Sequence, residues 1–232
     1  GVRGRPGFTL AVVLTLALGI GANTAIFGVV DGVVIKTLPF LGADQLVSVE
    51  HVAPGLEVEQ FRMSASQYFT YREEGRVFQH IGLYGDGGRT ITGRGEPEQA
   101  RALFVTHDVL QALAVQPQLG RLFTEADAAP NGMPMAPVVI LTHAYWQRRF
   151  GGDPSVVGQR LIADGSPAEV IGVMPEGFRF LDMEPAAEVI SLLALDRGRA
   201  DLDGFNFWSL ARLKPGMTVA DANADIARML PI

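Results

Sequence analysis

Residues 6–30 carry no charged side chain, and this run constrains the fold more than any other feature of the chain. Within residues 8–30, only Asn23 and three threonines interrupt Ala, Val, Leu, Ile, Phe and Gly. About 20 apolar residues, rising about 1.5 Å each, span the ~30 Å hydrocarbon core of a bilayer. Because a backbone in lipid must satisfy its own hydrogen bonds, the run predicts one transmembrane helix.

The charges that flank this run predict its orientation. Arg3 and Arg5 precede it, whereas Asp31 and then Lys36 follow. Basic residues favour the cytoplasmic side, so we expect a cytoplasmic N-terminus and a large domain on the outer side. The alternative is a secretory signal peptide. The apolar region of a signal peptide is typically 7–15 residues long, and a small-x-small cleavage site follows it. The apolar run of this chain is longer and continues without such a site, which favours a retained membrane anchor.

Small residues repeat at helical spacing along the predicted span. Ala17, Gly21 and Ala25 lie four residues apart, and Gly28 and Gly32 repeat that step. Small residues on one helix face let backbones approach closely in lipid, so we expect these five positions to pack against other transmembrane helices. The alternative is that glycine is simply frequent in membrane spans.

Composition excludes several classes of function. The net charge of −6 is opposite in sign to that of a nucleic-acid-binding domain. Cysteine is absent, so the chain forms neither disulfides nor thiolate metal sites. Its two lysines, Lys36 and Lys214, follow Ile and Leu, whereas a P-loop needs Gly-Lys-Ser/Thr. If the protein works with ATP, another chain must bind the nucleotide.

The rest of the chain predicts an α+β domain, because strand and helix patterns are mixed along it. Asp164-Gly165 between two apolar segments, 159–163 and 169–174, predicts a β-hairpin. The glycines of 82–88 predict a turn. Further strands are predicted at 45–53, 99–106, 138–141, 188–195 and 207–213, and helices at 64–79, 108–114, 143–150 and from Thr218 onward.

Several local signals sharpen these assignments. Ser64 with Gln67, and Thr218 with Asp221, have capping-box spacing. Thr142 is a good N-cap for the helix at 143–150. In the loop 120–127 we expect Leu122 and Phe123 to dock into the core, and 128–137 is a loop suited to an insertion.

The sequence shows no catalytic, cofactor-binding or metal-binding constellation. The histidines lack metal-ligand spacing, so we interpret them as isolated structural or surface residues. Arg148-Arg149 could bind an anion, but at a helix end a favourable interaction with the helix dipole is the simpler interpretation. The histidines are His51, His80, His107 and His143, and the expected core aromatics are Trp146, Phe150, Phe178 and Phe180.

Four segments resemble MacB-type (FtsX-like) ABC transporter permeases. Residues 6–40, PGFTLAVVLTLALGIGANTAIFGVVDGVVIKTLPF, resemble the first span of that family. Residues 104–127, 138–180 and 211–226 resemble its periplasmic core domain. Together they cover nearly the whole chain, and their order is more specific than any one segment.

The resemblance implies a four-span permease with a large α+β domain between spans one and two. Residues 1–40 would then be the first transmembrane helix and its stalk, and 41–232 the core domain. That domain would have a porter-like part and an inserted second subdomain at roughly 100–185. The implied location is the bacterial inner membrane, with the bulk of the chain periplasmic.

The function implied by the resemblance is mechanical coupling rather than catalysis. A cytoplasmic ABC ATPase subunit would hydrolyse ATP, and the permease would carry the motion to the extracytoplasmic domain. The implied partners also include a second permease copy or a paired permease, and a periplasmic adaptor with an outer-membrane channel, which some members use. The family implies no cofactor, and we expect no enzymatic activity.

The sequence ends at Ile232, before the further spans that the resemblance implies. We therefore expect a fragment, or a truncated form, of a longer permease. The second hypothesis is a signal-anchored periplasmic binding or adaptor module. A secreted hydrolase is a third class, disfavoured because no nucleophile–base arrangement is present in the sequence.

Overall fold

The computed structural model describes residues 40–51, 61–93, 95–128, 137–181, 183–200 and 204–230. The predicted membrane span and its small residues, Ala17, Gly21, Ala25, Gly28 and Gly32, lie outside these ranges. None of the helices within the described ranges is long and apolar enough to cross a bilayer.

The described residues form a mixed α/β structure, as predicted. The α-helices are α2 (Ala65–Glu74), α3 (Asp108–Ala112), α4 (His143–Phe150) and α5 (Val219–Met229), and the short 3₁₀ helices are η1 (Ala43–Gln45), η2 (Glu125–Asp127), η3 (Pro154–Val156) and η4 (Arg197–Arg199). The strands are β1 (Leu46–Val47), β2 (Phe78–Thr92), β3 (Glu98–Val105), β4 (Leu119–Gly120), β5 (Val138–Leu141), β6 (Arg160–Ala163), β7 (Ser166–Val173), β8 (Val189–Leu192) and β9 (Trp208–Leu213).

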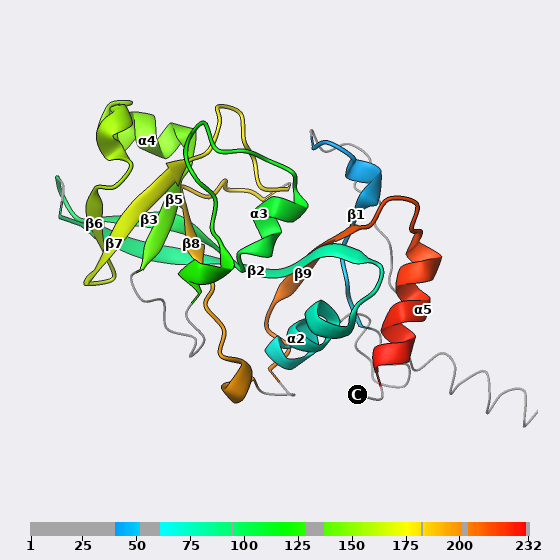
Figure 1. Cartoon of the computed structure of the whole chain (residues 1–232). Coiled ribbons are helices and arrows are strands. Elements are labelled where there is room, and N and C mark those ends of the chain that lie inside the picture. Colours follow the sequence, from blue (N-terminus) through cyan, green and yellow to red (C-terminus); the bar gives the residue numbers. More distant parts are fainter. Residues whose placement is uncertain are drawn as a thin grey trace, which may run out of the picture.

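The long strand β2 belongs to two bodies at once (Figure 1). Its first half, from Phe78 to Tyr84, pairs antiparallel with β9, and β1 pairs with the other side of β9. Its second half, from Tyr84 to Ile91, pairs antiparallel with β3. We name the first body, built from both ends of the described chain, the terminal sheet (β1, β9 and the first half of β2).

The second half of β2 closes a ring of strands that we name the barrel. Around the ring, β2 pairs with β3, β3 with β8, β8 with β5, β5 with β7, β7 with β6, and β6 again with β2. The β3–β8 and β5–β7 pairs are parallel and the others antiparallel. Closing the ring pairs both edges of each ring strand along at least part of its length.

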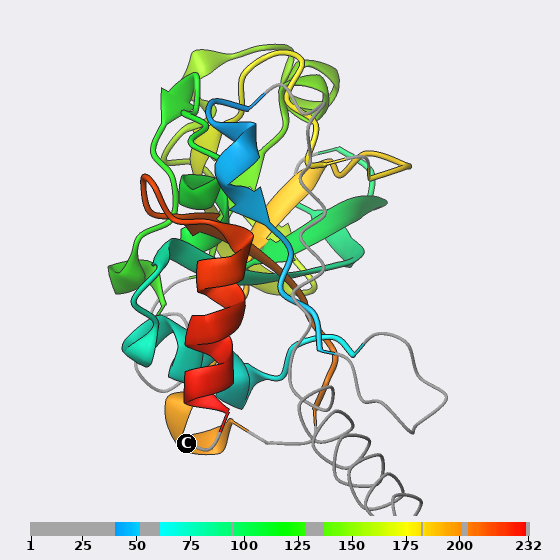
Figure 2. The ribbon, with the colours of Figure 1, turned by 90° about the vertical axis from the view of Figure 1, so that its right-hand side faces the viewer.

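Helices cover both faces of the terminal sheet (Figures 1 and 2). Side chains alternate between faces along a strand, so Ala211 and Leu213 of β9 pack with α2 and α5. Leu210, on the opposite face, packs with Leu110 of α3. Figure 2 looks at this body from its end, with α5 in front and the barrel strands behind.

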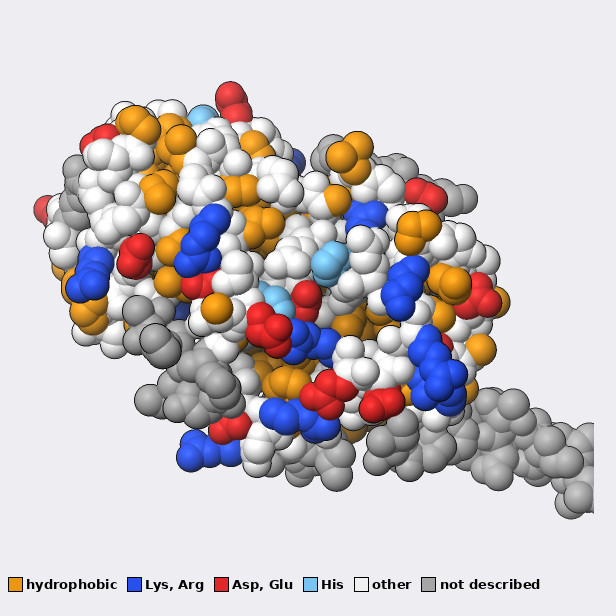
Figure 3. Space-filling model, in the orientation of Figure 1, with side chains coloured by type: hydrophobic (Ala, Val, Ile, Leu, Met, Phe, Trp, Pro, Cys, Tyr) orange, Lys and Arg blue, Asp and Glu red, His pale blue; other side chains and the backbone are white. Residues whose placement is uncertain are grey.

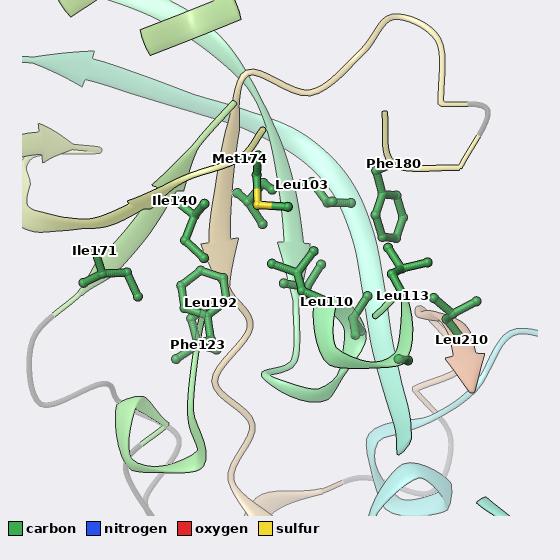
Figure 4. Packing of buried hydrophobic residues seen from close by; sticks show 14 of the residues in the cluster. Leu103, Leu110, Leu113, Phe123, Ile140, Ile171, Met174, Phe180, Leu192 and Leu210 are labelled. Atoms are coloured by element: carbon green, nitrogen blue, oxygen red, sulfur yellow. The ribbon is translucent and has the colours of Figure 1, made fainter. Parts of the chain in front are cut away.

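The position of β5 between two buried clusters explains why its sequence is entirely apolar. Val139 and Leu141 point into the barrel, where they pack in one cluster with Trp146 of α4. Val138 and Ile140 point outward into a second cluster, with α3, Phe123 and Phe180, part of which is shown in Figure 4. A strand buried on both faces has no polar side, so the usual alternation of apolar and polar residues is lost.

Several local predictions are confirmed. Both predicted capping boxes form, at the start of α2 and of α5. The Asp164-Gly165 turn joins β6 to β7. Phe123 is fully buried, and Leu122 is partly buried against the same cluster. Thr142 does occupy the N-cap of α4, but its hydroxyl donates instead to the Glu188 carbonyl (3.1 Å).

Three local predictions are wrong, one in the kind of element and two in its extent. The glycines of 82–88 do not form a turn but lie inside β2, where Gly82 and Gly87 allow Val109 and the Phe104 ring to approach the backbone. The helix predicted at 64–79 ends at Glu74, because Gly75 takes an extended conformation and Phe78 already begins β2. Over its described part, residues 45–51, the strand predicted at 45–53 is reduced to β1, two residues long, and residues 52–53 lie outside the described ranges.

Candidate functional site

Residues 40–45, which we name the lead-in segment, begin the described structure at the end of the predicted span and stalk. The Phe40 ring packs against Phe178, which follows β7, with ring centroids 6.5 Å apart. After the left-handed Gly42 (φ 60°), η1 leads into β1. The lead-in segment therefore contacts a loop of the barrel before it joins the terminal sheet.

The guanidinium of Arg212 holds the lead-in segment in place. On β9, Arg212 donates from Nη2 to the Leu41 carbonyl (2.8 Å) and from Nη1 to the Gly42 carbonyl (2.9 Å). Its Nε donates to the carbonyl of Ala112, the last residue of α3 (2.5 Å). One side chain thus joins β9, the lead-in segment and α3.

Carbonyl groups, rather than a carboxylate, surround this cation. Arg212 is only 6% exposed, and burial lowers its pKa, an effect that the nearby Asp44 partly opposes. The negative end of the α3 dipole faces the guanidinium at Ala112, which favours a positive charge there. A buried cation that already satisfies three carbonyls is costly to remove, because those carbonyls would lose their partner.

A charged cluster lies between the two bodies, in the middle of the face drawn in Figure 3. We name it the seam: Arg72 of α2, Asp108 of α3 and Glu125 of η2, with two histidines beside them. Arg72 Nη2 lies 2.7 Å from Glu125 Oε1, and Arg72 Nε lies 3.3 Å from Asp108 Oδ2. Arg72 therefore ties α2, on one face of the terminal sheet, to two segments on the other side.

His80 and His107 join the seam, so the interpretation of isolated histidines is wrong for both. His107 Nε2 lies 3.2 Å from Asp108 Oδ2, and His80 Nδ1 lies 3.5 Å from Asp108 Oδ1. Burial lowers the pKa of His107, although Asp108 opposes that shift. Within the described ranges, no group of His, Asp and Glu residues has the arrangement needed to hold a metal ion.

Among the open cavities of the described residues, one adjoins the seam and another lies at the barrel. A cavity of about 260 Å³ adjoins the seam, with Tyr68 and Phe69 among its lining residues and Arg72, Glu125 and Arg197 contributing charge. The charges in it are largely paired, since Arg197 also binds Glu73 (2.9 Å). The lining of this cavity therefore combines aromatic side chains with charges of both signs, and neither sign predominates.

The second cavity, of about 380 Å³, lies at the mouth of the barrel away from α4. Arg89 of β2 crosses this mouth, with Nη1 2.9 Å from Asp164 Oδ2 and Nε 3.3 Å from Ser191 Oγ. Its Cζ lies 5.0 Å from the centroid of the Phe104 ring. The mouth is therefore held by an arginine clamp between β2, β8 and the β6–β7 turn.

The remaining residues singled out in the sequence are the arginine pair of α4 and four aromatic residues, and they lie in the barrel or against it. Arg148 and Arg149 lie in the last turn of α4, as predicted, but each also lies near a carboxylate: Arg148 Nη2 is 2.7 Å from Glu188 Oε1, and Arg149 Nε is 3.6 Å from Glu98 Oε1. The anion-binding alternative is therefore not favoured. The aromatics Trp146, Phe150 and Phe180 are buried, and Phe178 is partly buried.

Sequence reasoning missed Arg212 and the seam. One sequence signal was available for Arg212: an arginine in the middle of the apolar strand SLARL, at a position facing the core. No comparable signal marks the seam, because Arg72 and Asp108 are brought together only by the packing of α2 and α3 around the edge of β2.

Comparison with known structures shows the same fold in three transporter domains. The periplasmic region of MacB from Actinobacillus actinomycetemcomitans is 15% identical, with a TM-score of 0.55 over 73% of each chain. The extracellular domain of the non-canonical ABC-type transporter YknZ from Gram-positive bacteria is 17% identical (TM-score 0.51; 72% of this chain, 82% of that one). A permease-protein domain from Porphyromonas gingivalis is 15% identical (TM-score 0.56; 84% and 83%).

The family comparison is independent of these structures. A comparison with curated protein sequences found no match. The model of the MacB-like periplasmic core domain, however, matches residues 9–229, which is nearly the whole chain. The resemblance to MacB-type ABC transporter permeases is thus confirmed, and with it an extracytoplasmic type of domain. The chain belongs to the MacB-like periplasmic core domain family.

Proposed function

We propose that this chain is the extracytoplasmic domain, with the first membrane span, of an ABC transporter permease. In this proposal a partner ATPase in the cytoplasm hydrolyses ATP, and the span carries the resulting motion into the domain. The observation that carries the proposal is the family match over residues 9–229, which includes most of the predicted span as well as the domain.

The proposal places ATP hydrolysis on a partner. Neither of the two lysines, Lys36 and Lys214, stands in a Gly-Lys-Ser/Thr sequence, so these 232 residues do not supply a P-loop. We further propose that Ala17, Gly21, Ala25, Gly28 and Gly32 form the helix face on which a second span packs. Pairing with another permease copy, contact with a periplasmic adaptor, and residence in a bacterial inner membrane belong to the same proposal.

We also propose a division of the domain that follows the strand pairing. The terminal sheet with α2 and α5 would be the porter-like part, and the barrel the inserted subdomain. The predicted insertion at roughly 100–185 would then extend back into the second half of β2 and forward to the end of β8. The supporting observation is that β2 and β9 pair across the whole insertion.

Co-purification tests this proposal. The full-length gene product that contains this chain is expressed with an affinity tag and extracted in detergent together with candidate ABC ATPase subunits from the same cell. We expect one ATPase to be retained and its rate of ATP hydrolysis to change when the permease is present. Recovery of no ATPase, with no effect on hydrolysis, would contradict the proposal and favour an anchored binding or adaptor module.

A further inference from the structure

We propose that Arg212 is the positioning residue that couples the lead-in segment to the barrel. This inference rests on the proposed function, in which motion of the membrane span reaches the domain through residues 40–45. The role requires a side chain that touches the arriving chain and a part of the structure that moves with the barrel. Arg212 touches both, through Leu41 and Gly42 on one side and Ala112 on the other.

The contact to Ala112 leads directly to the barrel. Helix α3 follows β3, one of the ring strands. Leu110 of α3, and Leu113 directly after it, pack in the same buried cluster as Ile140 of β5 (Figure 4). Ile190 of β8 belongs to the same cluster. Close-packed clusters of this kind transmit displacement because they deform little. A pull on Leu41 and Gly42 is therefore passed through the guanidinium to α3 and on to two more barrel strands.

The lead-in segment makes a second contact beside the first, and this contact restrains the segment less. Phe40 meets Phe178 through ring packing alone, at 6.5 Å between centroids. Three charge-assisted hydrogen bonds in a fixed fork are directional, whereas ring packing allows sliding. We therefore assign the coupling to Arg212 and only lateral support to Phe40.

The backbone at Gly42 is shaped to accept this arginine. Gly42 has φ 60°, and a Cβ atom placed there would lie 2.9 Å from Arg212 Nη1. Gly42→Ala would thus strain the backbone and crowd the guanidinium while leaving Arg212 itself intact. It offers a second way to weaken the same contact.

The first experiment measures amide hydrogen exchange in the chain itself. Arg212→Met keeps an apolar stem of similar length and removes the donors, and Arg212→Lys keeps the charge but loses the fork. The control is Arg62→Met, which removes an exposed guanidinium lying 4.3 Å from the centroid of the Trp208 ring. We expect exchange in residues 41–46 to become roughly tenfold faster in Arg212→Met, intermediate in Arg212→Lys and unchanged in the control.

The second experiment repeats the measurement on the full-length permease reconstituted with its ATPase, with and without ATP. In the wild type and Arg62→Met we expect ATP to change exchange within residues 138–192 of the barrel. In Arg212→Met that change is lost although ATP turnover continues. A purely structural role would instead lower the melting temperature and ATPase binding together. If Arg212→Met melts below the assay temperature, Arg212→Lys and Gly42→Ala carry the same comparison.

The outcomes separate the two proposals. Unchanged exchange of residues 41–46 in Arg212→Met, or a full ATP-dependent change in the barrel of that variant, overturns the role of Arg212 alone. Absence of any ATP-dependent change in the wild type overturns the proposed function and the coupling role with it. Loss of the ATP-dependent change in Arg212→Met, together with its retention in Arg62→Met, supports both.

Discussion

Gly82 of β2 lies so close to Val109 of α3 that a Cβ atom placed on Gly82 would come within 2.5 Å of Val109 Cγ2. The Thr106 hydroxyl would lie 2.7 Å from the same Cβ. That hydroxyl also accepts a hydrogen bond from the backbone N–H of Leu83 (3.0 Å). At this position Val109 of α3 packs directly on the backbone of β2, because Gly82 has no side chain of its own.

Gly82→Ala is expected to destabilise the domain by about 1–3 kcal/mol, because an added methyl in a close-packed site forces the neighbours apart. Gly85→Ala is the matched control, since Gly85 lies in the same strand and a Cβ there would meet nothing within 4 Å. It should change stability by about 0.5 kcal/mol or less. Urea unfolding measures both, and equal losses would contradict the packing argument.

Tyr145→Phe tests how α4 closes the barrel. The Tyr145 hydroxyl donates to Glu98 Oε1 (2.6 Å), and burial together with Glu98 raises the pKa of this tyrosine. Removing the hydroxyl leaves the Glu98 carboxylate with one donor fewer, at a cost of about 1–2 kcal/mol in the free energy of unfolding. Tyr84→Phe, which keeps its ring packed on Phe180, should cost less. A larger loss for Tyr84→Phe in thermal unfolding would contradict this.

The seam should show energetic coupling between Arg72 and Asp108. In a double-mutant cycle with Arg72→Met and Asp108→Asn, we expect a coupling energy of about 1–2 kcal/mol, because both side chains are largely buried. The control cycle uses Arg197 and Glu73, an exposed pair with N–O 2.9 Å, where about 0.5 kcal/mol or less is expected. Chemical denaturation measures both cycles, and equal coupling energies would contradict the expected difference between the buried and the exposed pair.

Asp127 should make stability depend on pH below about 4. A hydrogen bond from Arg121, helped by donors on Thr124 and opposed by burial, lowers its pKa from 3.8 to about 2. A depressed folded-state pKa stabilises the domain above the unfolded value, so its contribution, at most about 2 kcal/mol, is lost as pH falls from 3.8 towards 2. Asp127→Asn should reduce the dependence of the free energy of unfolding in urea on pH over this range. An unchanged pH profile in Asp127→Asn would count against the Arg121 contact.

The small-residue face of the predicted span remains a prediction that mutagenesis can check. Gly21→Leu would place a bulky side chain on the face of Ala17 and Ala25, and we expect it to weaken association of the permease in the membrane. Gly19→Leu is the control, because two residues correspond to about 200° around a helix and so to the opposite face. Cross-linking yield in membranes compares the two, and equal yields would remove the case for this face.

Local signals predicted much of the fold. Capping boxes and the Asp-Gly turn depend on hydrogen bonds within a few residues, so they survive in any tertiary setting, as at Ser64, Thr218 and Asp164. The apolar run of β5 was likewise sufficient to identify a buried strand.

Features that depend on distant partners could not be predicted in the same way. The local sequence of the β2 glycines is typical of a turn. Gly82 and Gly87 instead occupy positions where Val109 and Phe104 lie against the backbone and leave little room for a side chain. The site depends on the same kind of contact. His80 and Asp108 are 28 positions apart in the sequence, and Leu41 and Arg212 are 171 apart, so no local pattern links either pair.

The sharing of β2 by the two bodies limits how this domain can change in evolution. Leu83 faces the core of the terminal sheet, and Ile91, further along the same strand, faces the interior of the barrel. Deleting one residue between them would turn every later side chain of the strand to its other side, exposing Ile91 and forcing polar groups inward. A single-residue change between Leu83 and Ile91 would therefore need a compensating β-bulge, like the register irregularity that β2 already has between Phe78 and His80, whereas loops can gain or lose single residues freely.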